Sequence, residues 1–202
     1  MSDLMTWEDH QQWERSWHGD CINSWNEETK QQVYAKRMGL EAIMELGKYP
    51  VYDLKEISIL DVGCGPYSLL LKCKNFKGYG IDPCDYPKWV AERYKEAGIE
   101  YKKMLAEDTT WTTEVFDEVW MYNVLQHTQD PELIMKNMRR AGKVLRIFEW
   151  IETEQTPGHP HILQADKLNE WVGGIGATEE LHESGCYGKC WYGVFKGDNY
   201  EK

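Results

Sequence analysis

The chain has 202 residues, a length that suits one α/β domain with a modest appendage and is short for two full domains. Apolar residues make up 42% of it, which is enough for a hydrophobic core and excludes global disorder. The formal net charge is −11, whereas a protein that binds nucleic acid normally presents a basic face to the phosphates. This charge disfavours nucleic acids and anionic lipid surfaces as partners.

The N-terminal sequence and the cysteines bear on the cellular compartment. The first residues lack the basic start and the apolar run of a secretory signal peptide. No run of about 18 apolar residues occurs, so we expect no membrane span. The six cysteines are scattered, and Cys64 and Cys73 fall in segments that we expect to be buried. These features favour a reduced, cytoplasmic protein.

Residues 1–48 are polar and rich in tryptophan, and they precede the first expected strand of the sheet. From Glu27 to Leu46, apolar residues recur at helical spacing and predict an amphipathic helix. Asn23 or Ser24 is the expected N-terminal cap of this helix.

From residue 57 onward, short apolar runs alternate with amphipathic segments. The expected strands cover residues 57–62, 78–82, 100–105, 116–122, 144–150, 178–183 and 189–195. The expected helices cover residues 68–73, 87–97, 131–141 and 164–172. Strands that alternate with helices predict a mainly parallel sheet with helices on both faces, and the last two strands predict an antiparallel hairpin at its edge.

The loop after the first of these strands reads Asp61-Val62-Gly63-Cys64-Gly65-Pro66. Ligands of open α/β sheets bind beyond the carboxyl ends of the strands, and glycines let the backbone approach them closely. A dinucleotide fingerprint would place its third glycine where Ser68 stands, and the carboxylate of Asp61 would repel a pyrophosphate. S-adenosylmethionine (SAM) has no phosphate and carries a sulfonium and an ammonium, so this loop favours SAM over NAD.

Asp82 ends the next expected strand and lies 21 residues after Asp61. At about this spacing, an acidic side chain reaches the ribose hydroxyls of a bound nucleotide. Charge-assisted hydrogen bonds of this kind contribute about 1.5–3 kcal/mol each. The alternative is a turn aspartate before Pro83, and the nearby glycine loop favours the ribose role.

These marks are followed by the run from Phe116 to His127 and by Asp130-Pro131, and together they resemble class I SAM-dependent methyltransferases of the small-molecule type. The resemblance implies an α/β, Rossmann-like, doubly wound and mainly parallel seven-stranded sheet with an antiparallel C-terminal hairpin strand. It also implies a helical lid over residues 1–48 and a SAM-binding domain over residues 49–202. The implied reaction transfers a methyl group from SAM to a small-molecule acceptor, and we expect the accepting atom to be oxygen.

The resemblance assigns cofactor binding to residues that match the family's motifs, namely Asp61, Gly63, Cys64, Gly65, Ser68, Asp82, Pro83, Ala106, Glu107, Asn123 and Val124. Two positions depart from the family's pattern. Tyr67 stands where a last glycine is frequent, and Leu105 stands where the segment that binds adenine usually has an aspartate. We therefore expect the adenine contacts to come from the backbone of Ala106 and from Glu107.

His127 is the candidate general base. An alcohol must lose a proton as it accepts a methyl group, and a general base contributes roughly 10²- to 10⁴-fold to such a reaction. His127 follows the fourth expected strand, beside the expected cofactor, and histidine titrates in the useful range. We hypothesise that His127 is the base or a substrate ligand, and the alternative is a structural histidine that holds the loop across the site.

Other candidates lie after the fifth strand and in the lid. His159 and His161 follow the fifth expected strand, where they could hold a polar substrate. In the lid we expect Arg37 to pair with the methionine carboxylate of SAM. The lid residues expected on the substrate side are Trp17, His18 and Tyr34. The alternative for the lid tryptophans is that they only pack the lid onto the sheet.

No metal site is expected, because neither the pair His159 and His161 nor the pair Cys186 and Cys190 completes a tetrahedral set of ligands. Two further functions remain open from the sequence, an NAD-type oxidoreductase and a non-catalytic SAM-fold binding protein. The motifs do not identify the methyl acceptor or the oligomeric state, because substrate contacts lie in the lid and the loops.

Overall fold

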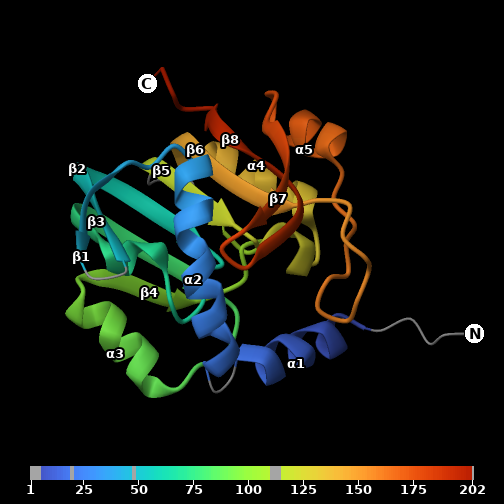
Figure 1. Ribbon diagram of the computed structural model, residues 1–202, viewed down its shortest axis with the longest axis horizontal. Coiled ribbons are helices and arrows are strands. Elements are labelled where there is room, and N and C mark those ends of the chain that lie inside the picture. Colours follow the sequence, from blue (N-terminus) through green and yellow to red (C-terminus); the bar gives the residue numbers. More distant parts are fainter. Residues whose placement is uncertain (1–5, 19–20, 47–48, 110–114, 202) are drawn as a thin grey trace, which may run out of the picture.

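The computed structural model of the chain describes residues 6–18, 21–46, 49–109 and 115–201. The strands are β1 Ala42–Leu46, β2 Tyr49–Val62, β3 Cys73–Asp82, β4 Ile99–Lys103, β5 Phe116–Tyr122, β6 Gly142–Trp150, β7 Ala177–Glu183 and β8 Cys186–Lys196. The helices are α1 Trp7–His18, α2 Ile22–Arg37, α3 Lys88–Glu96, α4 Pro131–Ala141 and α5 Ala165–Val172, with short 3₁₀ turns η1 at Leu69–Lys72 and η2 at Leu125–His127. Together they form one twisted sheet with helices on both faces (Figure 1).

The sheet has the strand order β4-β3-β2-β5-β6-β8-β7, and β1 pairs with the start of β2. The strands β4, β3, β2, β5 and β6 run parallel to one another, whereas β8 is antiparallel to both β6 and β7. This confirms the predicted doubly wound sheet with its C-terminal hairpin, and β1 is an additional antiparallel strand. The chain runs outward from β2 to β4 and returns to the other side of β2 as β5, so the order reverses beside the end of β2. A ligand crevice is expected there.

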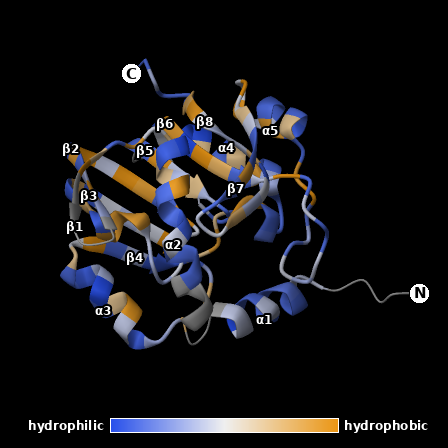
Figure 2. Cartoon of the chain, in the orientation of Figure 1, coloured by the Kyte–Doolittle hydropathy of each residue, from blue (hydrophilic) through white to orange (hydrophobic). Residues whose placement is uncertain are grey.

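Alternate residues along the central strands face opposite layers of the core. Ile59 and Trp120 belong to the layer under α2, η1 and α3, whereas Leu60 and Val119 belong to the layer under α4 and α5. In Figure 1, α2 accordingly crosses one face of the sheet while α4 lies behind it. Figure 2 shows that apolar residues concentrate on the strands, whereas α1 and α3 are largely polar. The strand period of two explains this division, since successive side chains point to opposite faces.

The prediction for the segment before β2 was wrong in part. The expected helix to Leu46 ends at Arg37, because Gly39 adopts a left-handed conformation with φ +71° and stops it. Residues 42–46 then form β1 and pair with β2. The expected caps, Asn23 and Ser24, lie inside α2, which starts one residue after Cys21 with its φ of +64°.

The crossover from β2 to β3 is the 3₁₀ turn η1 and not the expected helix over 68–73. Three consecutive amides at its start donate to side-chain hydroxyls. Ser68 N–H donates to Tyr94 (3.0 Å), Leu69 N–H donates to Tyr122 (2.9 Å), and Leu70 N–H donates to Ser68 Oγ (3.0 Å). These hydrogen bonds anchor the connection to α3 and β5.

Other elements agree closely with the sequence pattern. β5 and α4 cover the predicted residues, and Asp130 caps α4 by accepting the N–H of Leu133 at 2.9 Å. Gly173, with φ +71°, ends α5 as predicted. No helix among the described residues combines the length and the apolar character needed to cross a membrane.

Candidate functional site

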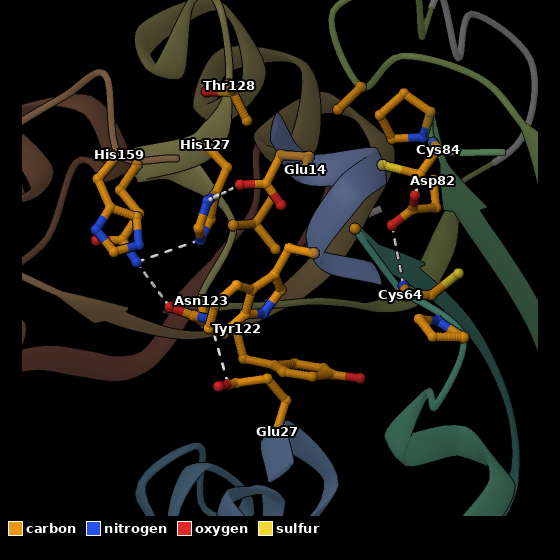
Figure 3. A pocket seen from close by; sticks show the side chains of 18 of the residues that line it. Glu14, Glu27, Cys64, Asp82, Cys84, Tyr122, Asn123, His127, Thr128 and His159 are labelled. Carbon is orange, nitrogen blue, oxygen red and sulfur yellow. Dashed lines mark hydrogen bonds and ion pairs between the residues drawn. The ribbon is translucent and has the colours of Figure 1, made fainter. Parts of the chain in front are cut away.

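A cavity of about 490 Å³ lies beyond the carboxyl ends of β2, β3 and β5, within the size range of small-molecule sites. Two sets of residues line it. The sheet wall comprises lining residues within 63–67, 81–84, 104–107 and 122–128. The lid wall comprises lining residues of α1 and α2 together with Trp150, Thr153, His159, Gly185 and Tyr187. Figure 3 shows Asp82 and Cys64 on one side of the cavity, with His127 and His159 on the other.

The glycine loop after β2 needs both of its glycines. Gly63 has φ +66°, and a Cβ there would lie 2.6 Å from the side chain of Val124. The N–H groups of Gly63 and Cys64 both donate to the carbonyl of Ile81 (2.9 and 3.1 Å), which ties the loop to β3. Gly65 has φ +57° and nothing lies within 4 Å of its Cβ position, so its backbone borders open space.

Asp61 and Ser68 lie beneath this loop and do not line the cavity. Asp61 is fully buried, and its Oδ2 accepts hydrogen bonds from Ser68 Oγ (2.6 Å) and Tyr122 OH (2.8 Å). Burial raises the pKa of Asp61 to about 7, although the two hydroxyl donors act in the opposite direction. The expected direct cofactor contacts of these two residues do not match the geometry, because both side chains face the protein and position the loop from below.

Asp82 lies at the end of β3 and at the edge of the cavity. Its Oδ2 accepts the N–H of Gly65 (3.0 Å), and its Oδ1 accepts the N–H of Cys84 (2.9 Å) and the hydroxyl of Tyr86 (3.0 Å). These bonds fix the carboxylate of Asp82 at the edge of the cavity. Pro83 also lines the cavity.

The segment after β4 supplies the third part of the sheet wall. Met104 N–H donates to the carbonyl of Asp82 (3.1 Å), and the lining continues through Leu105, Ala106 and Glu107. The carboxylate of Glu107 also accepts the N–H of Gln129 at 2.9 Å. Glu107 thus borders the cavity and joins this segment to the loop before α4.

The turn after β5 carries Asn123 in a left-handed conformation with φ +59°. Its N–H donates to the carbonyl of Phe148 at 2.8 Å. The next two amides, of Val124 and Leu125, donate to the carboxylate of Glu149 on β6, each at 3.1 Å. Glu149 is fully buried, and burial raises its pKa to about 7. A carboxylate inside the core therefore holds the turn that leads to His127.

His127 stands at the junction of the sheet wall and the lid wall. Its Nδ1 lies 3.0 Å from Oε1 of Glu14 and 2.6 Å from the carbonyl oxygen of Gly158. The ring of His159 meets it edge-on, with an interplanar angle of 67° and 4.8 Å between the ring centroids. Burial opposes protonation of His127, but Glu14 and the Gly158 carbonyl favour it, and its pKa is raised. Burial and the neighbouring His127 lower the pKa of His159 to about 4.

Two of the expected ligand contacts lie away from the cavity. Arg37 does not line it, and its guanidinium pairs with Glu179 (3.0 Å) and Glu183 (2.9 Å) on β7. His161 also does not line it, and its Nε2 lies 2.9 Å from the carbonyl of Thr128. Both side chains bind other elements of the fold. We therefore do not propose a contact of Arg37 with the SAM carboxylate or a contact of His161 with the substrate.

The lid residues Trp17 and Tyr34 do line the cavity, whereas the side chain of His18 lies outside the described residues. Trp17 stacks on Trp13 with 5.3 Å between the ring centroids, and Tyr34 donates to Glu27 Oε2 at 3.2 Å. Lining residues that the sequence did not single out include Trp13, Glu14, Glu27 and Tyr187. The signal available for two of them was the amphipathic spacing of tryptophans in residues 7–18.

Metal ligands do not gather anywhere in the described part of the chain, where no group of three His, Cys, Asp or Glu side chains could hold an ion. Cys186 and Cys190, the pair considered for zinc, are both buried free thiols in the core.

The comparisons with known proteins agree with this geometry. Residues 60–144 match a family described as "Methyltransferase domain". No curated protein matches the chain. The solved structures that resemble it include the 1,6-didemethyltoxoflavin-N1-methyltransferase of Burkholderia thailandensis, with a TM-score of 0.64, 13% identity and coverage of 98% of this chain and 92% of that one.

Two further structures widen the comparison. The N-methyltransferase NodS of Bradyrhizobium japonicum WM9, solved with S-adenosylhomocysteine, has a TM-score of 0.59 and 14% identity, with coverage of 95% of this chain and 99% of that one. The [4+2]-cyclase SpnF has a TM-score of 0.54 and 19% identity, and the match covers 77% of this chain but only 58% of SpnF. At these identities the structures support the fold, and the family rests on the matched residues 60–144, which contain the glycine loop, Asp82 and His127. Residues 60–144 thus match a methyltransferase domain, and the chain has the fold of SAM-dependent methyltransferases.

Proposed function

We propose that the cavity binds SAM against the sheet wall and that the methyl group passes to a small-molecule acceptor held by the lid wall, at an oxygen atom. The observation that carries this proposal is the convergence of the glycine loop, Asp82 and His127 on one cavity. We retain residues 1–48 as the lid and residues 49–202 as the SAM-binding domain.

The sheet wall fits SAM in its chemistry. The open space beside Gly65 admits a ligand close to the backbone, and the carboxylate of Asp82 lines the cavity at the end of β3, where it would face the ribose. Ala106 and Glu107 would border the adenine, while Cys64, Asn123 and Val124 would line the space between the loop and the turn after β5. When bound, SAM supplies an electrophilic methyl group on its sulfonium.

His127 is the proposed base. Its Nδ1 faces two acceptors, Glu14 and the Gly158 carbonyl, so Nδ1 carries a proton and Nε2 is the basic nitrogen. Nε2 would take the proton from the acceptor's hydroxyl as the new bond to carbon forms. The turn after β5 would hold the acceptor in line with the methyl group, and such positioning supplies much of the rate of a displacement.

A small acceptor suits the size and lining of the cavity. Aromatic rings from both the lid and the hairpin border it, among them Trp17, Tyr34, Trp150 and Tyr187. The carboxylates of Glu14 and Glu27 lie on the same side, which disfavours anionic groups such as phosphate on the acceptor. The net charge of −11 disfavours nucleic acid for the same reason.

Calorimetry with SAM and NAD, followed by a screen of hydroxylated and aminated acceptors with isotope-labelled methyl SAM, tests the proposal. We expect SAM binding, no NAD binding, and an O-methyl product identified by NMR. His127→Gln should reduce turnover by about 10²- to 10⁴-fold while SAM affinity is kept. An N-methyl product contradicts the oxygen assignment, unchanged turnover of His127→Gln contradicts the base, and SAM binding without any transfer favours the non-catalytic alternative.

A further inference from the structure

The lid helix α1 contacts His127 and the turn at residues 157–158, on one side of the cavity. Glu14 is only 7% exposed, and its carboxylate lies 3.0 Å from Nδ1 of His127. On the same helix, His10 contacts the carbonyl of Pro157 through Nδ1. Trp13 packs so closely on Gly158 that a Cβ there would lie 2.3 Å from its ring. In Figure 1, α1 accordingly lies beside the segment that follows β6.

The same contacts determine which nitrogen of His127 carries the proton. The two groups that face Nδ1, Glu14 and the Gly158 carbonyl, are acceptors. Nε2 lies 3.3 Å from the amide nitrogen of Gln126, and that amide donates to Oδ1 of Asn123 at 2.8 Å. An amide nitrogen is only a donor, so Nε2 is an acceptor and the neutral ring is protonated at Nδ1.

We propose that Glu14 is a positioning residue for His127: α1 carries the carboxylate that holds the imidazole with its proton on Nδ1 and leaves Nε2 as the base. This inference rests on the proposed function, because there His127 takes a proton from the acceptor. It assigns the lid a second task beside choosing the acceptor. When α1 is not docked on the turn at 157–158, His127 loses one of its two Nδ1 partners, and the base is no longer fully oriented.

The pH dependence has a definite sign. The ionisable groups that face His127 are Glu14 from α1, Glu149 from β6 and His159 from the turn after β6. A base must be neutral, so the rate rises with pH as His127 loses its proton. Since Glu14 raises the pKa of His127, removing its charge moves this rising limb to lower pH.

Glu14→Gln removes the charge with little change of shape, and Glu8→Gln at an exposed position of the same helix is the matched control. The ¹⁵N resonances of the imidazole report the tautomer and the pKa of His127 without turnover, in protein saturated with S-adenosylhomocysteine. We expect an Nδ1–H tautomer in the wild type, a lower His127 pKa in Glu14→Gln, and no change in Glu8→Gln. A wild-type ring protonated on Nε2, or an unchanged titration in Glu14→Gln, overturns the proposal.

Kinetics supply the second readout. We expect the rising limb of kcat/KM in Glu14→Gln to move to lower pH and its plateau to fall roughly 10- to 100-fold, with SAM affinity unchanged. Glu14→Asp, which keeps the charge, should recover part of the loss. A plateau that falls while the limb stays in place is the mark of a merely structural role and overturns the proposal. If the wild type fails to transfer a methyl group to any acceptor, the proposed function fails, and the ¹⁵N titration still decides the role of Glu14.

Discussion

The two walls of the cavity are built in different ways. In the sheet wall, turns at the ends of neighbouring strands are held by backbone amides that donate to carboxylates, as Gly65 donates to Asp82 and Val124 donates to Glu149. In the lid wall, side chains from distant parts of the chain meet, and Glu14 and His127 are 113 residues apart. Under the proposed function, cofactor binding would depend on a local backbone framework, whereas acceptor choice would depend on side chains that can be exchanged without changing the fold.

Gly63→Ala should be the most damaging change in the sheet wall. A left-handed residue with a Cβ costs about 1–2 kcal/mol, and this Cβ would also meet the side chain of Val124 at 2.6 Å. We expect calorimetry to detect no SAM binding and the melting temperature to fall. Gly98→Ala is the control, because Gly98 has φ +73° but nothing within 4 Å of its Cβ position. The Gly98→Ala variant should lose stability but keep its SAM affinity. An unchanged SAM affinity in Gly63→Ala would contradict the close fit of this loop.

Asp82→Asn should weaken SAM binding by about 10- to 100-fold, because it removes the charge from the proposed bonds to ribose and from the bond to Gly65. Calorimetry measures the loss. Asp85→Asn is the matched control, since Asp85 is exposed and pairs with Lys103 outside the cavity lining. Similar losses in both variants would show that general charge, and not the position of Asp82, determines the affinity.

Asp61→Asn should change the pH dependence of stability. The pKa of Asp61 is raised to about 7 in the folded protein, whereas an unfolded aspartate titrates near 4. Between these values the folded state binds more protons, so stability falls as pH rises from about 4 to 7 and is level above that. Urea unfolding across this range should show that the free energy of unfolding falls less steeply with pH in the variant than in the wild type. The difference in slope should be at most about 1.4 kcal/mol per pH unit. Glu149 retains a contribution of the same sign, and parallel curves would contradict the prediction.

Tyr187→Ala should have the smallest effect and should affect only the lid wall. Tyr187 lies near the start of β8, is 72% exposed and lines the cavity. We expect the KM for the acceptor to rise by about two- to tenfold, since an exposed aromatic contact contributes roughly 0.5–1.5 kcal/mol. SAM affinity and melting temperature should not change. Tyr200→Ala, at another exposed tyrosine outside the cavity lining, is the control, and a loss of SAM affinity in Tyr187→Ala would remove the distinction between the walls.

Most of the sheet was predictable because its signals are local. β5 ends in four consecutive apolar residues, Val119 to Tyr122, and α4 starts at Pro131 after the cap Asp130, so a few adjacent residues specify each element. The strand β1 was not predictable from its own residues. Its apolar positions fit a helical period. The segment is nevertheless a strand, because the left-handed Gly39 stops the helix and the residues that follow pair with β2.

The candidate site divides in the same way. The glycine loop and Asp82 follow strand ends and are placed by a motif. The side-chain direction of Asp61 is not part of the motif, because it depends on the hydroxyls of Ser68 and Tyr122. Arg37 pairs with glutamates of β7, more than 140 residues further along the chain, and nothing near Arg37 in the sequence announces them.

The three hydroxyl acceptors at η1 have a consequence for the motions of the molecule. A short surface connection ordinarily opens on its own, far below the free energy of global unfolding. Here the amides of Ser68 and Leu69 donate to Tyr94 of α3 and Tyr122 of β5, so opening the connection breaks its hydrogen bonds to both elements. Hydrogen exchange at these amides should accordingly be as slow as in the central strands. The connection that follows the glycine loop is then as rigid as the core of the sheet.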